Sequence, residues 1–263
     1  MLMENLTWEE VRDLVETDPV VIIPLGATEQ HGHHLPVKVD IAIANYIAQA
    51  VGEQSGALVT PPLNFGYSIA WPDYPGTLSF SSETFLSALH DICYSLIRVG
   101  FKKLFLLNGH NGNLMLMQTA ACDLIDKYGD HDISIAVATY IHMAMEKCNA
   151  IGENFNDGTH ANEAETSIMM YLFGDEVKEE KRILAGETYQ KHKIINFDAG
   201  AYTVNQWPKQ SYHGAYGNPG LATREKGRRY VEAFIEDITA FVADFRAGKY
   251  DPIGKDGMPQ VFQ

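Results

Sequence analysis

Short apolar runs and helical patterns alternate along most of the chain. Four runs rich in aliphatic and β-branched residues, each about four to eight residues long and bounded by turn residues, are typical of buried strands. These predicted strands are Val20–Leu25, Ala57–Thr60, Lys103–Asn108 and Ile133–Tyr140. Apolar residues spaced by three and four predict the helices. These are expected from Thr7 to about Thr17, from Asp40 to Gly56, and over Ser82–Val99, Leu114–Tyr128, Ala164–Phe173 and Thr223–Phe245.

This alternation predicts the fold class. Four successive strand–helix repeats imply a mostly parallel sheet with helices on both of its faces. We therefore expect an α/β protein with three αβα layers. The 263 residues are enough for one large core, so we expect residues 1–263 to form a single domain. The mixed sequence between residues 175 and 220 predicts loops and short strands.

Composition and charge narrow the classes of function. Apolar residues make up 46% of the chain, which is ordinary for a globular protein. The net charge of −14 argues against a nucleic acid or an anionic membrane as partner. No apolar run approaches about 18 residues, so no membrane span is expected. The three cysteines lack close pairing and the first ten residues lack a secretory pattern, so we expect a cytoplasmic enzyme acting on a small molecule.

The loop after the first predicted strand is rich in metal-binding side chains. Within twelve residues it carries three histidines and two carboxylates, namely Glu29, His31, His33, His34 and Asp40. Imidazole and carboxylate groups bind Zn²⁺, Mn²⁺ or Fe²⁺. A polar loop that happens to be rich in histidine is the alternative, and the alternative role for Asp40 is a helix cap. We expect His33 and His34 to support the ligands.

Two later segments supply matching groups. His110 follows the third predicted strand by two residues, and ligands of an open parallel sheet bind beyond the carboxyl ends of its strands. His160, Glu163 and Glu165 lie at a predicted helix start, where acidic residues are common without any function. We prefer that solvated role for Glu163 and expect Glu165 to be a metal ligand. His160 suits a general acid or base, with a structural helix cap as the alternative.

A charge count favours two metal ions over one. Two divalent ions carry four positive charges, Glu29, Asp40 and Glu165 carry three negative charges, and one bridging hydroxide would make the cluster neutral. Coordination lowers the pKa of water from about 16 to roughly 7, which would supply a nucleophile at neutral pH. A carboxylate that bridges the two ions must reach both, and Asp40 is our candidate.

The segment from residue 64 to residue 80 is predicted to be a loop with many aromatic residues. It contains Trp71 and Tyr74 among several glycines and prolines. Loops of this kind often form the wall of a pocket, although aromatic residues can also simply pack a loop against the protein. We treat Trp71 and Tyr74 as candidates for substrate contact.

Taken together, these motifs resemble the creatininase (creatinine amidohydrolase) family. The matching segments are Gly26-Ala-Thr-Glu-Gln-His-Gly-His-His34, Tyr74-Pro-Gly-Thr77, Asn108-Gly-His110, His160 with Glu165-Thr-Ser167, and Leu221-Ala-Thr-Arg-Glu-Lys-Gly227. The resemblance runs from the first strand to the last helix. It implies one α/β domain, a dinuclear Zn or Mn centre, hydrolysis of a non-peptide C–N bond, and a homo-oligomer that is often a hexamer. By motif position, the family's metal ligands match Glu29, His31, Asp40 and His110, with Asp40 as the bridge.

Two departures from the family pattern concern the ligands and the pocket. In the enzyme that gives the family its name, a glutamate two residues after the histidine of Asn-Gly-His binds metal. This chain has Gly112 there, so we expect Glu165 to complete the coordination. Two tryptophans that close over the substrate in that enzyme are replaced here by Ile141 and Asn156. We therefore add Asn156 to the substrate-contact candidates, with Trp71 as a substitute for the missing rings.

These observations lead to one main hypothesis and two alternatives. We expect a dinuclear metal hydrolase that cleaves a small-molecule C–N bond, such as that of a cyclic amide, with a metal-bridging hydroxide. A formamide deformylase or an inosose C–C hydrolase of the same family is the first alternative. A non-catalytic metal- or sugar-binding module is the alternative from another class, and the intact ligand set argues against it.

Overall fold

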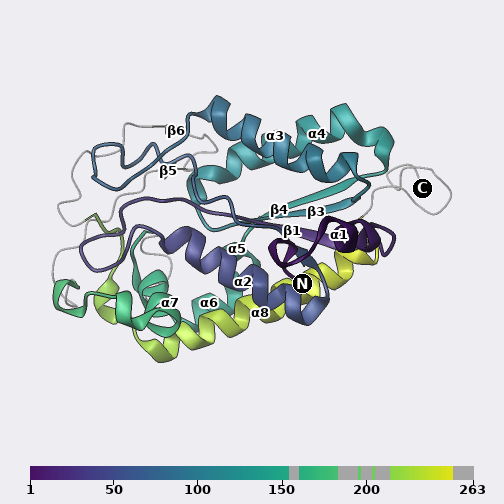
Figure 1. The fold of residues 1–263 in the computed structure, drawn as a ribbon. Coiled ribbons are helices and arrows are strands. Elements are labelled where there is room, and N and C mark those ends of the chain that lie inside the picture. Colours follow the sequence, from purple (N-terminus) through teal and green to yellow (C-terminus); the bar gives the residue numbers. More distant parts are fainter. Residues whose placement is uncertain (154–159, 183–194, 197–202, 205–213, 251–263) are drawn as a thin grey trace.

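The computed structural model describes residues 1–153, 160–182, 195–196, 203–204 and 214–250 (Figure 1). Its main sheet has the strand order β2-β1-β3-β4, and all three neighbouring pairs are parallel. The strands are β1 (Val20–Leu25), β2 (Leu58–Val59), β3 (Lys103–Asn108) and β4 (Ser134–Thr139). A separate antiparallel pair, β5 (Ile195–Asn196) and β6 (Thr203–Val204), lies in the mixed region of the sequence. The predicted parallel sheet is therefore confirmed.

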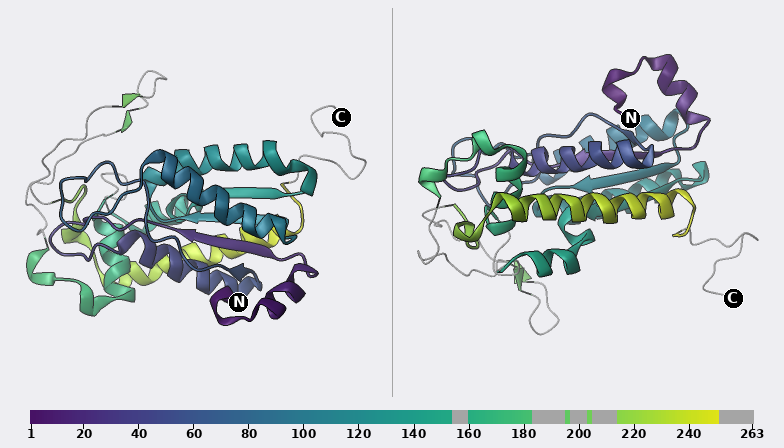
Figure 2. Two further views of the ribbon diagram at one scale, coloured as in Figure 1. Left: turned by 45° about the horizontal axis from the view of Figure 1, so that its top comes forward. Right: turned by 90° about the horizontal axis from the view of Figure 1, so that it is seen from below.

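Helices cover both faces of this sheet, as the predicted three-layer fold requires. On one face lie α3 (Ser82–Arg98) and α4 (Leu114–Tyr128), and on the other lie α2 (Val39–Ser55) and α8 (Arg224–Arg246) (Figure 1). Three more helices join α8 on the second face: α5 (Tyr140–Met143), α6 (Met145–Ile151) and α7 (Glu163–Leu172). The short α1 (Trp8–Val15) packs at the edge of the hydrophobic core that lies between the sheet and helices α3 and α4. The long α8 runs along the length of the sheet (Figure 2).

Strand β1 shows why two cores form. Val21 and Ile23 contribute to the core under α3 and α4, whereas Val20 and Ile22 contribute to the core under α2 and α8. Successive side chains of a strand point to opposite faces of a sheet, and a parallel sheet is covered on both. A strand without alternating polar residues is therefore the pattern that this central position requires.

The ends of several helices follow from local sequence signals. Thr7 forms the predicted capping box with Glu10, because its side chain accepts from the Glu10 N–H while the Glu10 carboxylate accepts from the Thr7 N–H. Helix α2 stops at Gly56, which adopts the left-handed φ of 72° that a residue without a side chain tolerates best. None of the helices in the described parts of the chain is long and apolar enough to cross a bilayer.

The structure differs from the predicted elements at two strands and by two additional short helices. Strand β2 covers only the two central residues of the predicted Ala57–Thr60, and it is followed by Pro61 and Pro62, which have no N–H to donate. The strand expected to reach Tyr140 ends one residue earlier, where α5 begins. Neither α5 nor α6 was predicted, because helices of four and seven residues are too short for a periodic apolar signal.

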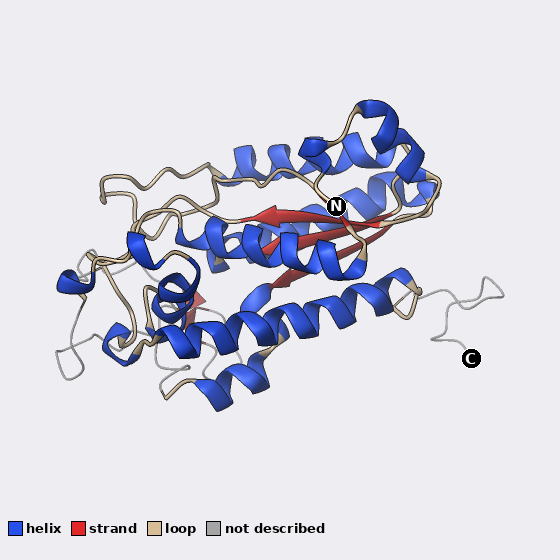
Figure 3. Cartoon of the chain, turned by 60° about the horizontal axis from the view of Figure 1, so that its bottom comes forward, coloured by secondary structure: helices blue, strands red, loops and turns tan. Residues whose placement is uncertain are grey.

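The parallel strands of the main sheet all point toward one edge, and the common direction of their arrows is visible in Figure 3. The loop that leaves β1 at this edge leads to α2, and the loop that leaves β3 leads to α4. Gly26 lets the first loop pass close to the start of α2, because an added Cβ would lie 2.5 Å from the backbone nitrogen of Ile41. The residues beyond the two strand ends are thereby brought to the first turn of α2.

Candidate metal centre

Asp40 lies at the centre of the cluster formed at this edge. It belongs to the first turn of α2, whose N-cap is Lys38, a residue that makes no side-chain cap hydrogen bond. The Asp40 side chain is 2% exposed and turns toward two histidines. The alternative role of Asp40 as a helix cap is therefore wrong.

The two carboxylate oxygens of Asp40 face different histidines. Its Oδ1 lies 3.1 Å from Nε2 of His31, and its Oδ2 lies 3.1 Å from Nδ1 of His110. The His31 ring is oriented by its other nitrogen, because Nδ1 lies 3.1 Å from the carbonyl oxygen of Glu29 and donates to it. A carboxylate that presents one oxygen to each of two imidazoles has the arrangement needed to bridge two cations.

The cluster divides into two groups of potential ligands that share Asp40. We call Glu29, Asp40 and His110 the sheet half, because two of the three residues follow strand ends. We call His31, Asp40 and Glu165 the helix half, because Glu165 comes from the first turn of α7. In each group, one ligand atom from every residue lies within 4.8 Å of the others. All five residues are buried.

In the sheet half, the orientation of His110 follows from one backbone group. Its Nε2 lies 3.2 Å from the carbonyl oxygen of Tyr67, which can only accept, so Nε2 carries the proton. The other nitrogen, Nδ1, is left to face the carboxylate of Glu29 at 3.4 Å. Gly112 packs against this arrangement, because an added Cβ would overlap the His110 ring and lie 2.6 Å from the Tyr67 oxygen. A side chain at position 112 would therefore displace His110.

In the helix half, Glu165 is held by the start of α7. Its Oε2 accepts from the N–H of Ala161 at 2.6 Å and lies 3.8 Å from Nε2 of His31. Asn162 caps the helix by accepting from the Glu165 N–H at 3.0 Å. Ala161 has a positive φ of 50°, a conformation that costs free energy in a residue other than glycine and is often found at functional sites.

Two neighbours of the predicted ligands support the helix half. Nε2 of His34 lies 2.9 Å from Oγ1 of Thr166, which links the first ligand loop to α7. Glu163, which we expected to be solvated, is instead 1% exposed and accepts from Nζ of Lys226 at 2.6 Å. That expectation is wrong because α8 covers the start of α7 and provides a lysine for the buried carboxylate. His33 is exposed.

The electrostatics of the cluster are those of a buried negative centre. Burial raises the pKa of Glu29, and it raises the pKa of Glu165 to about 7 against the opposing effect of His31. Burial would also raise the pKa of Asp40, but His31 and His110 bring it below its ordinary value. Burial by itself would lower the pKa of both histidines. The nearby carboxylates outweigh this effect and raise the pKa of His31 to about 10 and that of His110 to about 9.

Several carboxylate oxygens in the cluster lack a hydrogen-bond partner. Both oxygens of Glu29 and Oδ2 of Asp40 are buried without a properly aligned hydrogen bond from any described residue. Burying an ionised carboxylate is costly unless a cation or several donors compensate it. Nitrogen and oxygen donors around such bare oxygens match the preferences of Zn²⁺, Mn²⁺ and Fe²⁺. These residues therefore fit divalent metal ions.

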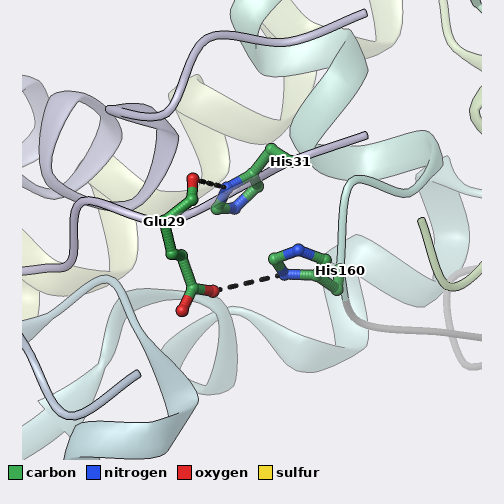
Figure 4. Close-up of side chains that lie close together, drawn as sticks. All are labelled: Glu29, His31 and His160. Atoms are coloured by element: carbon green, nitrogen blue, oxygen red, sulfur yellow. Dashed lines mark hydrogen bonds and ion pairs between the residues drawn. The ribbon is translucent and has the colours of Figure 1, made fainter. Parts of the chain in front are cut away.

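His160 lies beside both halves, before the first turn of α7. Its Nε2 lies 2.7 Å from the backbone carbonyl oxygen of Gln30 and 2.9 Å from the side-chain nitrogen of the same residue, while Nδ1 faces Oε1 of Glu29 at 3.4 Å (Figure 4). Burial and the nearby His31 lower the pKa of His160 well below its ordinary value, so the ring is neutral. Glu29, His31 and His160 also form a third group of possible ligands.

The predicted substrate-contact residues have different positions. Trp71 is 3% exposed and stacks on His160, with ring centroids 4.5 Å apart. Tyr74 is partly buried and meets the Trp71 ring edge-on at 5.6 Å. Asn156 lies outside the described residues. The aromatic loop thus reaches the site, and its tryptophan contacts the candidate catalytic histidine.

Two residues at the site were missed by the sequence reasoning. Gln30 contacts His160 through its carbonyl group, and its position between two candidate ligands was a signal that could have identified it. Tyr216 pairs with the His160 backbone, with its N–H 2.7 Å from the His160 carbonyl oxygen, and its ring lies 5.5 Å from that of Trp71. The glycine-rich sequence around Tyr216 has no periodic pattern that places it near the site.

Sequence comparisons link this chain to enzymes of one family. The profile of the creatininase family, described as creatinine amidohydrolase, matches residues 4–242. Creatinine amidohydrolase from Pseudomonas putida is 29% identical, covering 89% of this chain and 93% of that protein. The 3-dehydro-scyllo-inosose hydrolase of Thermotoga maritima is 27% identical, covering 95% and 86%. A mycofactocin precursor peptide peptidase from Mycobacterium ulcerans is 28% identical, covering 93% and 90%.

Solved structures agree with these relatives. A crystal structure of creatinine amidohydrolase has a TM-score of 0.79 and 28% identity, covering 96% of this chain and 98% of that one. A manganese creatininase and a mutant creatininase of the Zn–Zn type have TM-scores of 0.78, at 28% and 27% identity, each covering 92% of this chain and 97% of its own. Since the profile and the fold agree over nearly the whole chain, this protein belongs to the creatininase family of hydrolases.

Proposed function

We propose that the protein is a dinuclear-metal-dependent hydrolase that cleaves a small-molecule C–N bond, with a cyclic amide as the main candidate substrate. The observation that carries this proposal is the placement of the Asp40 carboxylate. One oxygen lies 3.1 Å from His31 and the other 3.1 Å from His110, and each histidine belongs to a separate ligand group. A single ion would not require two complete groups around one shared carboxylate.

In this proposal each half of the cluster holds one ion. Glu29, Asp40 and His110 would hold the first, and His31, Asp40 and Glu165 the second, with Zn²⁺ or Mn²⁺ as the expected metals and Fe²⁺ as a further candidate. When bound, such ions lower the pKa of a water molecule to about 7 and polarise a substrate carbonyl group. The zinc and manganese forms of the related creatininases support this choice of metals.

His160 is the proposed proton carrier. We assign its proton to Nε2, which lies 2.7 Å from the Gln30 backbone carbonyl oxygen, so that Nδ1, which faces Glu29, accepts a proton and returns it to a departing nitrogen. The lowered pKa keeps the ring neutral and therefore ready to accept. Trp71 covers one face of the ring and restricts the access of water from that side.

The cyclic amide is favoured by the relative from Pseudomonas putida, and a second substrate class is favoured by another observation. The inosose hydrolase of Thermotoga maritima matches this chain at nearly the same identity and over more of its length. Ile141 also stands in place of one of the tryptophans that close over the substrate in creatininase. A cyclic ketone cleaved at a C–C bond is therefore our second candidate.

A substrate screen with metal-loaded protein tests the proposal. Creatinine, other lactams, formamides, inososes and a short peptide would be incubated with the Zn²⁺ and Mn²⁺ forms, the chelated protein and the His160→Ala variant. We expect turnover of a lactam that needs metal and falls sharply in the variant. Turnover that survives complete chelation would contradict the proposal, and so would a fully loaded protein that hydrolyses none of these compounds.

Three broader expectations stay predictions. They are the single domain spanning residues 1–263, the homo-hexamer and the cytoplasmic location. Size measurements in solution would test the hexamer, and they are independent of the metal content that the other experiments measure.

A further inference from the structure

Asn113 occupies a helix start without acting as its cap. It directly precedes Leu114, the first residue of α4, where an asparagine side chain ordinarily accepts from the helix N–H groups. Here the side chain makes no such hydrogen bond and the backbone is already helical, with φ −77° and ψ −28°. The residue is fully buried. Its amide group therefore serves another purpose.

The amide of Asn113 joins three separate segments. Its Oδ1 accepts from the N–H of Tyr67 at 2.8 Å, and its Nδ2 donates to the carbonyl oxygen of Gly26 at 3.0 Å and to Oδ1 of Asn108 at 3.2 Å. These partners leave no ambiguity about the orientation of the amide, because a backbone N–H only donates and a carbonyl only accepts. One side chain thus connects the ends of β1 and β3 with the aromatic loop.

Two of these three partners hold His110. The Asn108 side chain forms two hydrogen bonds with the backbone of His110. Its Oδ1 accepts from the His110 N–H at 3.0 Å, and its Nδ2 donates to the His110 carbonyl oxygen at 2.7 Å. Tyr67 holds its ring, because the Tyr67 carbonyl accepts from Nε2. Asn113 is therefore bonded both to the residue that positions the His110 backbone and to the residue that orients its ring.

The third partner of Asn113, Gly26, belongs to the loop that carries Glu29, the other carboxylate ligand of the sheet half. Gly26 directly follows β1 and lies three residues before Glu29. The aromatic loop is packed tightly here, because a Cβ on Gly66 would lie 2.5 Å from the Gly26 oxygen and 2.6 Å from Oδ1 of Asn113. The close approach of the three segments therefore leaves no room for a side chain at position 66.

We propose that Asn113 is a positioning residue that sets the affinity of the sheet half for its metal ion. It does so by fixing the direction of His110 Nδ1 and the path of the chain that leads to Glu29. The inference rests on the proposed metal site. Glu165 of the helix half is held separately, by Ala161 and Asn162 at the start of α7, so the effect of Asn113 should fall mainly on the ion of the sheet half.

The test uses Co²⁺, whose visible absorption reports the geometry of its ligands, together with elemental analysis after dialysis. The variants are Asn113→Ala and Asn113→Asp, and the matched control is Asn111→Ala, an exposed asparagine of the same loop. The aspartate has the shape of asparagine but turns an oxygen toward the two acceptors. We expect both variants to bind one Co²⁺ about 10- to 100-fold more weakly, with an altered spectrum, and the control to match the wild type.

A second pair of variants shows which half is affected. In a Glu165→Gln background only the sheet half keeps its ligands, and adding Asn113→Asp should weaken the remaining ion. In a His110→Ala background the same addition should change nothing. Circular dichroism and thermal unfolding of the metal-free proteins verify that each variant is folded. If Asn113→Ala does not fold, the test is made with Asn113→Asp, which has the same shape as the wild-type side chain.

The outcomes separate this inference from the proposed function. Wild-type protein that binds two Co²⁺, with Asn113 variants that bind both at unchanged affinity and spectrum, would overturn the inference alone. Equal weakening of both ions would also overturn it, because the residue would then act on the fold as a whole. Wild-type protein that binds no Co²⁺ would overturn both the inference and the proposed function.

Discussion

The two halves of the site are built from different kinds of structure. The sheet half takes His110 and Glu29 from loops that leave neighbouring parallel strands, and backbone and amide hydrogen bonds hold these loops together. The helix half takes Glu165 from α7, and α7 is in place because it packs on α8. The first half depends on the register of the sheet, and the second depends on contact between helices distant in the sequence.

This difference extends to the charged residues around each half. The start of α7 contains the buried Glu163, which is paired with Lys226 of α8 and also accepts from the backbone of residue 153. Gly227 lets the two helices approach, since an added Cβ would overlap the carbonyl oxygen of Ser167. The helix half is thus sensitive to changes far from the ligands, whereas the sheet half is sensitive to the loops around it.

The largest expected effect is that of Asp40→Ala, because Asp40 is the one residue shared by both halves. We expect both ions to be lost and activity to fall to background. Asp40→Asn, which keeps the shape but removes the charge, should lose affinity in the same direction. Elemental analysis after dialysis gives the result, and a variant that keeps one tightly bound ion would show that Asp40 serves only one half.

His160→Ala should separate proton transfer from metal binding. We expect kcat to fall by about 10²- to 10⁴-fold, the usual contribution of a general acid or base, while both ions are retained. His142→Ala, an exposed histidine of α5, is the control and should retain activity. Loss of an ion together with the rate would instead assign His160 to the third ligand group, with Glu29 and His31.

Lys226→Met should weaken the support of the helix half. Removing the partner of the buried Glu163 leaves an uncompensated charge, and breaking a buried ion pair in this way costs about 3–5 kcal/mol of unfolding free energy. Arg228→Met on the same helix is the control, because its pairs with Glu225 and Glu232 are exposed and are worth about 0–1 kcal/mol. Urea unfolding of the metal-free proteins measures both, and equal effects would contradict the assigned role of Lys226.

The smallest expected effect is the dependence of metal affinity on pH. The raised pKa values, about 10 for His31 and about 9 for His110, keep both rings protonated at neutral pH in the metal-free protein. Each ion must displace one such proton, so affinity should rise by about tenfold per pH unit up to pH 9. Glu165, with a pKa of about 7, adds a second proton to the helix half below that pH.

Chelator competition between pH 6 and pH 8.5 would measure this dependence. The affinity of the helix half should fall more steeply than that of the sheet half as the pH drops below 7. Affinities that do not change with pH would mean that the histidines are already neutral before the metal binds.

Sequence patterns predicted the first ligand loop and His110 better than the start of α7. The strand, the turn and the polar residues of the first ligand loop are contiguous, so Glu29, His31 and Asp40 could be placed from local signals. His110 followed from the rule that ligands gather where parallel strands end. For Glu163 and Glu165 the local pattern was the same acidic helix start, and only the packing of α8 shows that both are buried and differ in their partners.

The residues that were missed act over long sequence separations. Asn113 bonds to Gly26 across 87 residues, and His160 bonds to Gln30 across 130. A single hydrogen bond between such positions leaves no periodic trace in the sequence. The aromatic loop was proposed as a pocket wall, but the stacking of Trp71 on His160 is a tertiary contact between residues 89 positions apart, which no local pattern shows.

The most direct test of two metal-binding halves that share Asp40 is a crystal structure of the Zn²⁺ form with an anomalous difference map. We predict two zinc peaks, each bound by one Asp40 oxygen at about 2.0–2.2 Å, with His110 and Glu29 on the first ion and His31 and Glu165 on the second. A single peak, or a second ion with Glu165 turned away and another group in its place, would contradict this account.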